Sequence, residues 1–152
     1  MINHEVTEKD WHRKQAVQAF NATWDLMDKP NRNEEDTLKM IHLAHTSRYH
    51  WGEIGTELEF ARGEWQISRV YSIANCPERA LFHANASLNY CISANIHDFD
   101  RAFAYEAIAR SYYLLNQLED YKTYYDLALV ESDTIKEMDD KTYFLKELNS
   151  IV

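Results

Sequence analysis

Histidines in one short segment are the residues whose type and spacing best suit chemistry. Residues 40–51 hold three of the seven histidines in the chain. His42 and His45 stand three positions apart, so a helix places them on one face, where neutral imidazoles commonly bind zinc and other divalent metals. Candidates for a further ligand are Glu53, Glu57 and Glu64. This pattern supports a metal-dependent enzyme or a metal sensor as the alternative function.

The same histidines also fit a structural role, in which they hydrogen-bond to tyrosine, glutamate or backbone groups within the fold. The chain has no His-Glu-x-x-His motif and no Glu-x-x-His motif, the patterns typical of zinc proteases and di-iron helical bundles. We therefore favour the structural role and expect no bound metal and no cofactor. His42 and His45 stay as the metal candidates.

The cysteines and glycines give weaker signals for catalysis. Cys76 lies at an expected helix start, but no base is identifiable beside it, and Cys91 is expected to face inward. We expect both to be reduced thiols, because two cysteines in a chain of this kind do not form a disulfide framework. The three glycines are isolated, so they form no phosphate-binding loop. No catalytic residue is predicted, and a binding protein is favoured over an enzyme.

The composition limits the classes of partner. The net charge of −9 repels phosphate backbones, so nucleic acid is not an expected partner. No apolar run approaches the roughly 20 residues that a membrane helix needs. Residues 1–5 lack the pattern of a signal peptide. We expect a cytoplasmic protein that binds proteins or peptides rather than a membrane, and the sequence leaves open whether it forms a homo-oligomer.

The distribution of glycine and proline predicts a helical fold. With only three glycines and two prolines, and no alternating segment rich in β-branched residues, the chain does not support strands. We expect a single all-α domain over residues 1–152 with about seven helices. The expected helices cover residues 7–28, 33–52, 57–75, 77–96, 100–116, 118–134 and 140–150. Short connections make neighbouring helices antiparallel.

Local signals define the ends of these helices. Thr7 is expected to cap the first helix and Asn33 the second, while Pro77 suits the first turn of the fourth. The fifth is expected to be capped by Asp98 or Asp100. Within the first helix, the residues expected to be buried on one stripe are Phe20, Trp24 and Met27.

Two of the expected hairpins share an order of small and aromatic residues. The first set is Ile67, Ser68, Tyr71, Ala80, Ala84 and Ser87, and the second is Ile108, Ala109, Tyr112, Tyr121, Tyr125 and Ala128. This order resembles the tetratricopeptide repeat (TPR), a helix pair of about 34 residues. The two units lie 41 residues apart, measured from Ala80 to Tyr121. The resemblance covers roughly residues 57–135.

The resemblance implies antiparallel helices stacked as TPR-like hairpins in a short α-solenoid, used as a protein–protein interaction or scaffold module. The units would be a degenerate hairpin at 7–52, repeat-like hairpins at 57–96 and 100–135, and a capping helix at 140–150. In the capping helix, Tyr143, Phe144 and Leu148 are expected to cover the apolar edge of the last hairpin.

A candidate partner-binding face follows from helical spacing. Arg62, Trp65 and Arg69 follow one another at spacings of three and four and share a stripe. In TPR proteins the first helix of each pair lines the ligand groove. The resemblance then adds the matching positions of the fifth helix, which are Phe103, Glu106, Arg110 and Tyr113.

The groove residues predict the chemistry of a ligand. Arginine beside aromatic rings can clamp a carboxylate while burying apolar side chains, so the implied ligand is an acidic or C-terminal peptide segment. Replacing Arg69 and Arg110 with Ala is then expected to abolish partner capture at unchanged stability. The interpretation left open is that Trp65 packs against the second helix and that the arginines pair with neighbouring carboxylates such as Glu59, Glu64 or Glu106.

Overall fold

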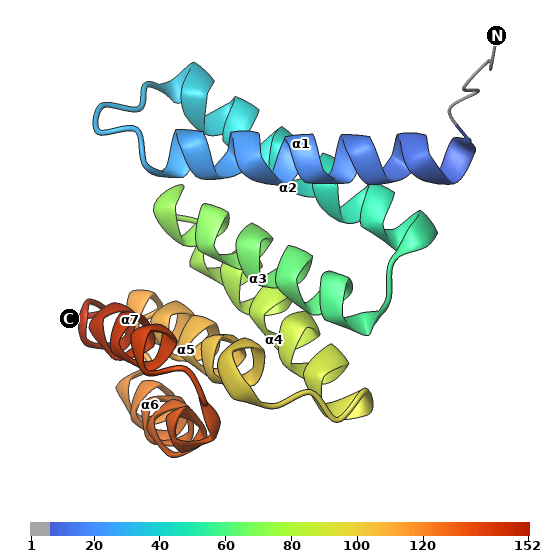
Figure 1. The fold of residues 1–152 in the computed structure, drawn as a ribbon. Helices are drawn as coiled ribbons and strands as arrows, with labels where there is room; N and C mark the ends of the chain where they lie inside the picture. The colour runs from blue at the N-terminus through green and yellow to red at the C-terminus, as the bar shows by residue number, and fades with distance from the viewer. Residues whose placement is uncertain (1–6) are drawn as a thin grey trace, which may run out of the picture.

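Helices account for the architecture of the chain in the computed structural model, which describes residues 7–152. Seven α-helices, a short 3-10 segment and no strand occur in this described part (Figure 1). Their bounds are α1 Glu8–Met27, α2 Glu34–Ile54, α3 Glu57–Ile73, α4 Pro77–Ser93, α5 Asp98–Leu114, α6 Leu118–Glu131, η1 Ser132–Thr134 and α7 Met138–Asn149. The all-α prediction is confirmed.

The starts of the first helices follow the local signals in the sequence. The Asp10 N–H donates to Thr7 Oγ1 at 3.1 Å. At the start of α2 the Asp36 N–H donates to Asn33 Oδ1 at 2.8 Å, and the Asn33 N–H donates to Asp36 Oδ2 at 3.2 Å. Pro77 is the first residue of α4, where its missing N–H costs no helical hydrogen bond. These predicted helix starts are confirmed.

The start of α5 differs from the prediction. The residue before the helix is His97, whose side chain makes no capping bond, so Asp98 and Asp100 are not its caps. Asp98 is the first residue of α5, with a φ of 66°, and its Oδ1 accepts the Phe99 N–H at 2.6 Å, but it also has a tertiary role. Its N–H donates to Thr134 Oγ1 at 3.0 Å, and its Oδ2 accepts the Lys136 N–H at 3.3 Å. Asp98 therefore joins the start of α5 to the connection that leads into α7.

Three successive helices end in the same way. The helices α3, α4 and α5 each contain 17 residues. Each is followed by an asparagine in the left-handed region, with φ values of 59° at Asn75, 54° at Asn95 and 59° at Asn116. Behind Asn75 the Cys76 N–H donates to the Tyr71 carbonyl at 2.8 Å. Asparagine tolerates this conformation better than most residues, so it ends the helix and turns the chain back.

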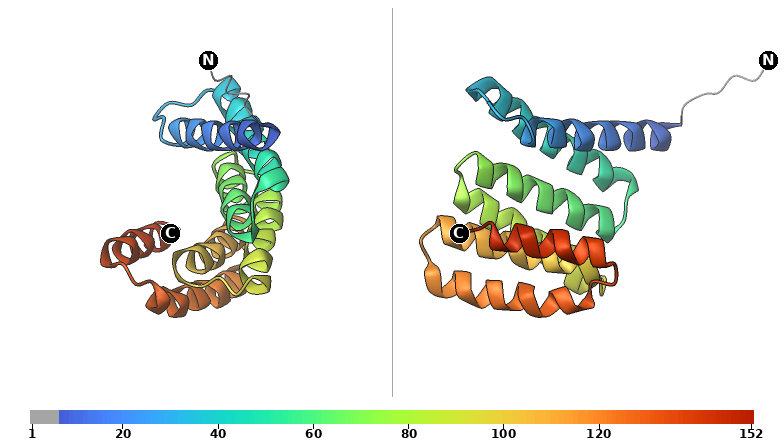
Figure 2. Two further views of the ribbon diagram at one scale, coloured as in Figure 1. Left: turned by 45° about the vertical axis from the view of Figure 1, so that its right-hand side comes forward. Right: turned by 60° about the vertical axis from the view of Figure 1, so that its left-hand side comes forward.

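Adjacent helices form three pairs that stack into a curved array. The pairs are α1 with α2, α3 with α4, and α5 with α6, and α3 also packs against α5. Figure 2 shows the pairs one above another, with α7 on the open side of the curve beside α5. The described chain is therefore a helical repeat-like stack whose concave side is partly covered by its own last helix.

The buried apolar residues form one cluster at each level of the stack. Between the first two pairs the cluster is Met40, Ala44, Ile67 and Val70. Between the second and third pairs it is Ala61, Ala84, Leu88, Cys91, Ala104, Ala107 and Ile108. Under α7 it is Ala102, Phe103, Ala109, Ala128, Ile135, Phe144, Leu148 and Ile151. The last cluster confirms that Phe144 and Leu148 of α7 cover the apolar edge of the final pair, whereas Tyr143, also expected there, is exposed and lies outside the cluster.

The buried stripe predicted for α1 is wrong. The buried residues of α1 are Ala16, Ala19 and Thr23, while the side chains of Phe20, Trp24 and Met27 are only half-buried. Small residues let α1 approach α2 closely, and the Ser47 hydroxyl of α2 donates to the Ala16 carbonyl at 2.8 Å. Phe20 and Trp24 are therefore left to line a pocket on the concave side, while Met27 packs against the cluster around Met40.

Candidate functional site

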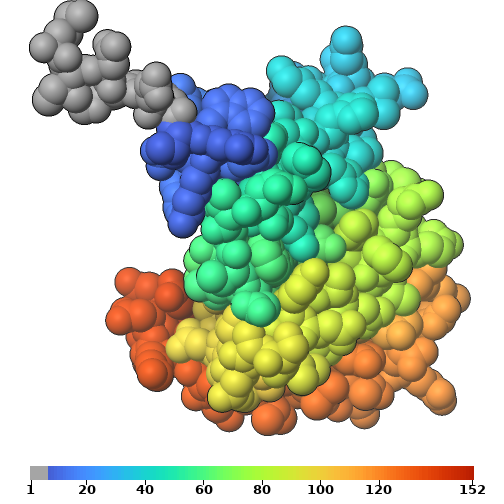
Figure 3. Space-filling view, turned by 90° about the vertical axis from the view of Figure 1, so that its right-hand side faces the viewer, coloured from blue at the N-terminus to red at the C-terminus, as the bar shows by residue number. Residues whose placement is uncertain are grey.

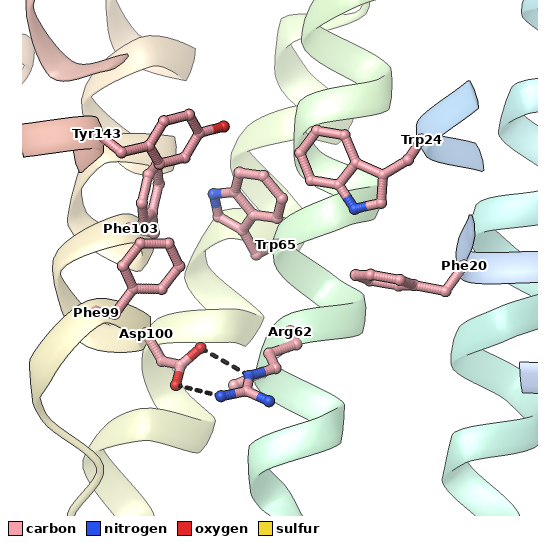
Figure 4. Close-up of a pocket in the computed structure, with 9 residues that line it drawn as sticks. Phe20, Trp24, Arg62, Trp65, Phe99, Asp100, Phe103 and Tyr143 are labelled. Carbon is pink, nitrogen blue, oxygen red and sulfur yellow. Dashed lines mark hydrogen bonds and ion pairs between the residues drawn. The ribbon is translucent and has the colours of Figure 1, made fainter. Parts of the chain in front are cut away.

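An aromatic pocket opens on the concave side between α1 and α7. We call it the aromatic pocket and define it by the residues that line it: Phe20, Trp24, Ala61, Arg62, Trp65, Phe99, Asp100, Phe103 and Tyr143. Its volume is about 240 Å³. Figure 3 shows the molecule hollowed between α1 and the C-terminal part of the chain, and Figure 4 shows the side chains. Four helices (α1, α3, α5 and α7) thus contribute to one pocket.

Helical spacing directs the aromatic rings into this pocket. Phe20 and Trp24 lie one turn apart on α1, and Phe99 and Phe103 lie one turn apart on α5. The Trp65 ring stands between them, with its centroid 5.7 Å from Trp24 and 5.5 Å from Phe103. The Phe99 and Phe103 rings are 4.6 Å apart. Because the rings pack against one another, the walls of the pocket are formed without a ligand.

One ion pair forms the polar side of the pocket. Arg62 donates from Nε to Asp100 Oδ1 at 3.0 Å and from Nη2 to Asp100 Oδ2 at 3.2 Å, as the dashed lines in Figure 4 show. The hydrogen bond to Asp100 raises the pKa of Arg62, although partial burial acts in the opposite direction. This bidentate geometry connects α3 to α5 and balances the charge of the arginine.

A second cluster of charged residues lies farther along the concave side, under α7. Arg69 Nη1 donates to Glu147 Oε2 at 3.2 Å, and Arg69 Nη2 lies 3.4 Å from Glu106 Oε1. Arg110 Nε donates to Glu106 Oε1 at 2.8 Å, and its Nη2 donates to the Glu147 carbonyl at 3.1 Å. The Glu106 side chain is fully buried. We call these four residues the arginine–glutamate cluster.

The charges within this cluster compensate one another. Burial lowers the pKa of Arg69, but the negative charges of Glu106 and Glu147 outweigh this effect and raise it. Two arginines face two glutamates, so the cluster is neutral as a unit. Because Glu147 belongs to α7, the cluster fastens α7 to α3 and α5.

The structure divides the partner-binding residues predicted from the sequence into two groups. Those that line the aromatic pocket are Arg62, Trp65 and Phe103. Those that line a separate pocket of about 160 Å³ beside Ile151 are Arg69, Arg110 and Tyr113. Glu106 is buried beneath Arg69 and Arg110. The pairing of the arginines with carboxylates, left open by the sequence, occurs with Asp100, Glu106 and Glu147.

Several residues of the aromatic pocket were not identified from the sequence. They are Phe20, Trp24, Ala61, Phe99, Asp100 and Tyr143. Phe20 and Trp24 carry a recognisable signal, since they share an i, i+4 spacing beside a stripe of small residues that packs more closely. Tyr143 carries none, because its position depends on where α7 packs.

The predicted histidine candidates lie away from both regions. His42 and His45 are exposed, and His45 Nε2 lies 2.9 Å from the Tyr71 hydroxyl. The rings of His45 and His83 are 5.5 Å apart, and the partial loss of solvent around the ring, together with His83, lowers the pKa of His45. Within residues 7–152, no group of three or more His, Cys, Asp or Glu side chains is arranged to hold a metal ion.

The two cysteines are unpaired. Cys91 is fully buried, which confirms its inward orientation, and burial raises the pKa of its thiol to about 12. The thiol is therefore protonated at neutral pH and is not nucleophilic. Cys76 is half-buried, and its Sγ lies 3.6 Å from the Ala74 carbonyl oxygen.

Two further findings bear on function. None of the helices in the described residues is both long enough and apolar enough to cross a lipid bilayer. Comparison with protein-family models, with curated proteins and with solved structures found no match.

Proposed function

We propose that this protein is a TPR-like interaction module that binds a segment of a partner protein on its concave side. One large side chain of the segment would enter the aromatic pocket. The observation that carries the proposal is this pocket, in which six aromatic rings from four helices surround a space of about 240 Å³.

The composition of the pocket favours protein binding. Binding energy at protein interfaces concentrates in a few buried positions, which are enriched in tryptophan, tyrosine and arginine. Trp24, Trp65 and Tyr143 are of these types, and all three are partly accessible. A pocket whose walls already pack together also avoids much of the cost of ordering side chains on binding.

The surface next to the pocket is long enough for a segment rather than a single side chain. A second pocket of about 260 Å³ shares Phe20 and Arg62 with the aromatic pocket and continues to Trp51 and Leu58. The two pockets adjoin at Phe20 and Arg62 and together extend along the first half of α3. This is the face that TPR-like arrays use for extended ligands.

A cytoplasmic location is part of the proposal. Two unpaired cysteines, Cys76 and Cys91, fit a reducing compartment, because thiols persist there without forming disulfides.

Selection from a display library of random peptides tests the proposal directly. The library is selected on the wild-type protein, and the enriched peptides are then measured by fluorescence anisotropy on variants. We expect Phe20→Ala and Trp24→Ala each to weaken binding by about tenfold or more, since each removes a wall of the pocket.

The matched control is Trp11→Ala, which removes the same type of side chain from the same helix. Trp11 is 47% exposed and does not line the aromatic pocket. Thermal melting of every variant verifies that it folds. A library that yields no enriched peptide, or peptides that bind Trp24→Ala as well as Trp11→Ala, would refute the proposed function.

A further inference from the structure

We infer that the partner segment carries lysine or arginine residues beside the side chain that enters the aromatic pocket. This inference rests on the proposed function and adds the charge of the partner to it. The sequence alone suggests the opposite sign, because it contains three arginines at the positions expected to line the groove: Arg62, Arg69 and Arg110.

The structure removes the reason to expect an acidic ligand. Arg62 pairs with Asp100 in a bidentate geometry, and both other arginines belong to the neutral arginine–glutamate cluster. An incoming carboxylate would have to displace an existing partner. It would then leave a carboxylate such as Glu106, which is fully buried, without its cation.

Carboxylates without such pairing stand one helical turn from side chains that line the aromatic pocket. Asp28 follows Trp24 by one helical turn at the end of α1, and Asp139 and Asp140 precede Tyr143 by one turn on α7. All three are exposed. On α7, Lys146 follows Tyr143 by one turn and is as close in helical spacing as Asp140. Three exposed carboxylates and one exposed lysine thus stand one turn from Trp24 or Tyr143, and we call the three carboxylates the acidic rim.

Neighbouring carboxylates also affect the pKa of the Tyr143 hydroxyl. Burial raises its pKa, the charge of Glu147 raises it further, and Asp28 acts in the same direction, while Arg69 opposes them. Asp28 belongs to α1 and Glu147 to α7, so each of the two helices that flank the opening places a carboxylate near enough to the Tyr143 hydroxyl to raise its pKa.

Aromatic walls suit a cationic segment as well as an apolar one. The faces of aromatic rings attract cations, and Arg69 already lies over Trp65 at 5.6 Å from the ring centroid. The aliphatic stems of lysine and arginine can cover apolar surface while their charged ends reach the carboxylates at the rim.

The overall charge makes other occupants of the pocket unfavourable. A second copy of this chain would bring another net charge of −9 to an acidic rim. Anionic lipids and nucleic acids would be repelled in the same way. A basic protein segment is the occupant that both the apolar walls and the acidic rim favour.

Three versions of one peptide test the inference. The strongest peptide from the display selection is synthesised with its polar positions as Lys, Gln or Glu, and its apolar positions are unchanged. We expect the Lys version to bind about tenfold more tightly than the Gln version and the Glu version to bind most weakly. Raising the salt concentration should reduce the difference, because the rim charges are exposed.

Reversing charges at two places distinguishes the effect of the rim carboxylates on peptide binding from the effect of the protein's net charge. The rim variant is Asp28→Lys with Asp139→Lys and Asp140→Lys. The control variant is Glu119→Lys with Asp120→Lys and Asp126→Lys on α6, which changes the net charge equally. Both variants alter two carboxylates in the first turn of a helix, so their effects on helix stability are matched.

The rim variant should lose the preference for the Lys peptide and the control variant should keep it. Equal binding of the three peptides to the wild type, or equal loss of preference in both variants, would overturn the inference. The proposed function would survive that result if the Gln peptide still required Trp24. If no peptide bound Trp24→Ala more weakly than Trp11→Ala, the proposed function would instead be refuted.

Discussion

The two halves of the concave side contain the same kinds of residues and differ in what covers them. Each half has arginine beside aromatic side chains supplied by α3 and α5. Toward the C-terminal ends of these helices, α7 lies over Arg69, Glu106 and Arg110 and leaves a smaller pocket of about 160 Å³ beside Ile151. Toward their N-terminal ends, between α1 and α7, the aromatic pocket stays open.

This difference shows that residue type does not distinguish a binding face from a packing face. Arg69 and Arg62 lie on the same stripe of α3, yet Arg69 meets Glu147, which is 78 positions away in the chain. Arg62 meets Asp100 at the edge of an open pocket. We conclude that the position of α7 decides which part of the stripe is available to a partner.

Two neighbouring residues of α7 should show the largest difference in stability between the packing face and the binding face of this helix. Phe144 is fully buried in the cluster under α7, whereas Tyr143 is 44% exposed at the aromatic pocket. We expect Phe144→Ala to lower the free energy of unfolding by about 3–5 kcal/mol, because it leaves a cavity in the core. Deleting residues 139–152 should be more damaging still, since it exposes the whole cluster. Urea denaturation measures both.

Tyr143→Ala is the control, and it should change stability much less while weakening peptide binding. If Phe144→Ala and Tyr143→Ala had the same effect on stability, α7 would not be divided into a packing face and a binding face. A deletion of residues 139–152 that melts at the wild-type temperature would contradict the capping role of α7.

Substitutions in the arginine–glutamate cluster should have the next largest effect on stability. Exchanging Arg69 and Arg110 together for Ala leaves the fully buried Glu106 without a cation, so we expect a loss of about 3–5 kcal/mol in the free energy of unfolding. The sequence had predicted unchanged stability for this double variant, on the assumption that both arginines face a ligand. Thermal and urea denaturation decide between the two.

Two further variants make the result specific. Adding Glu106→Gln to the double variant removes the buried charge and should recover part of the lost stability. Arg62→Ala, at a pair whose arginine side chain is 53% exposed, should cost less than about 1 kcal/mol. A double variant as stable as Arg62→Ala would show that the covered half of the concave side is not structural.

A smaller effect on stability is expected from histidines that lie in neither half of the concave side. Burial and the neighbouring His12 lower the pKa of His50, and burial with His83 lowers that of His45, both from 6.5. The unfolded chain therefore takes up these protons first, so stability is complete above about pH 6.5 and falls as the pH drops through the lowered values. Melting temperatures across this range measure the decrease.

His45→Gln with His50→Gln should flatten this pH dependence. Binding of the selected peptide should be much less affected by the double change, since neither residue lines the aromatic pocket. Stability that rises as the pH falls below about 6.5 would show that these side chains gain protons on folding, against the direction of their shifts.

Local signals explain why much of the fold could be predicted. Thr7, Asn33 and Pro77 act on helix starts within a few residues of themselves, and the structure confirms all three. The start of α5 was mispredicted because Asp98 has the residue type of a cap but is the first residue of the helix, where it also bonds to Thr134 and Lys136, which are remote in sequence. Where the partners of a side chain are distant, residue type alone does not decide its role.

The candidate site was less predictable for the same reason. Spacing placed Arg62, Trp65 and Arg69 on one stripe, but no spacing rule shows that α7 returns to cover part of it. The stripe of α1 was assigned by size, so Phe20 and Trp24 were expected in the core. The structure instead buries the small residues Ala16 and Ala19 against α2. Sequence periodicity shows which residues share a face, but tertiary packing decides what each face meets.

The central claim is that the open half of the concave side binds the partner. The most direct test is a nuclear magnetic resonance titration that follows the indole N–H signals of the four tryptophans as the selected peptide is added. Trp24 and Trp65 line the aromatic pocket, whereas Trp11 does not. We predict that the Trp24 and Trp65 signals shift together with a common binding curve while the Trp11 signal stays in place. Unchanged Trp24 and Trp65 signals at saturating peptide, or a shift confined to Trp11, would contradict the account.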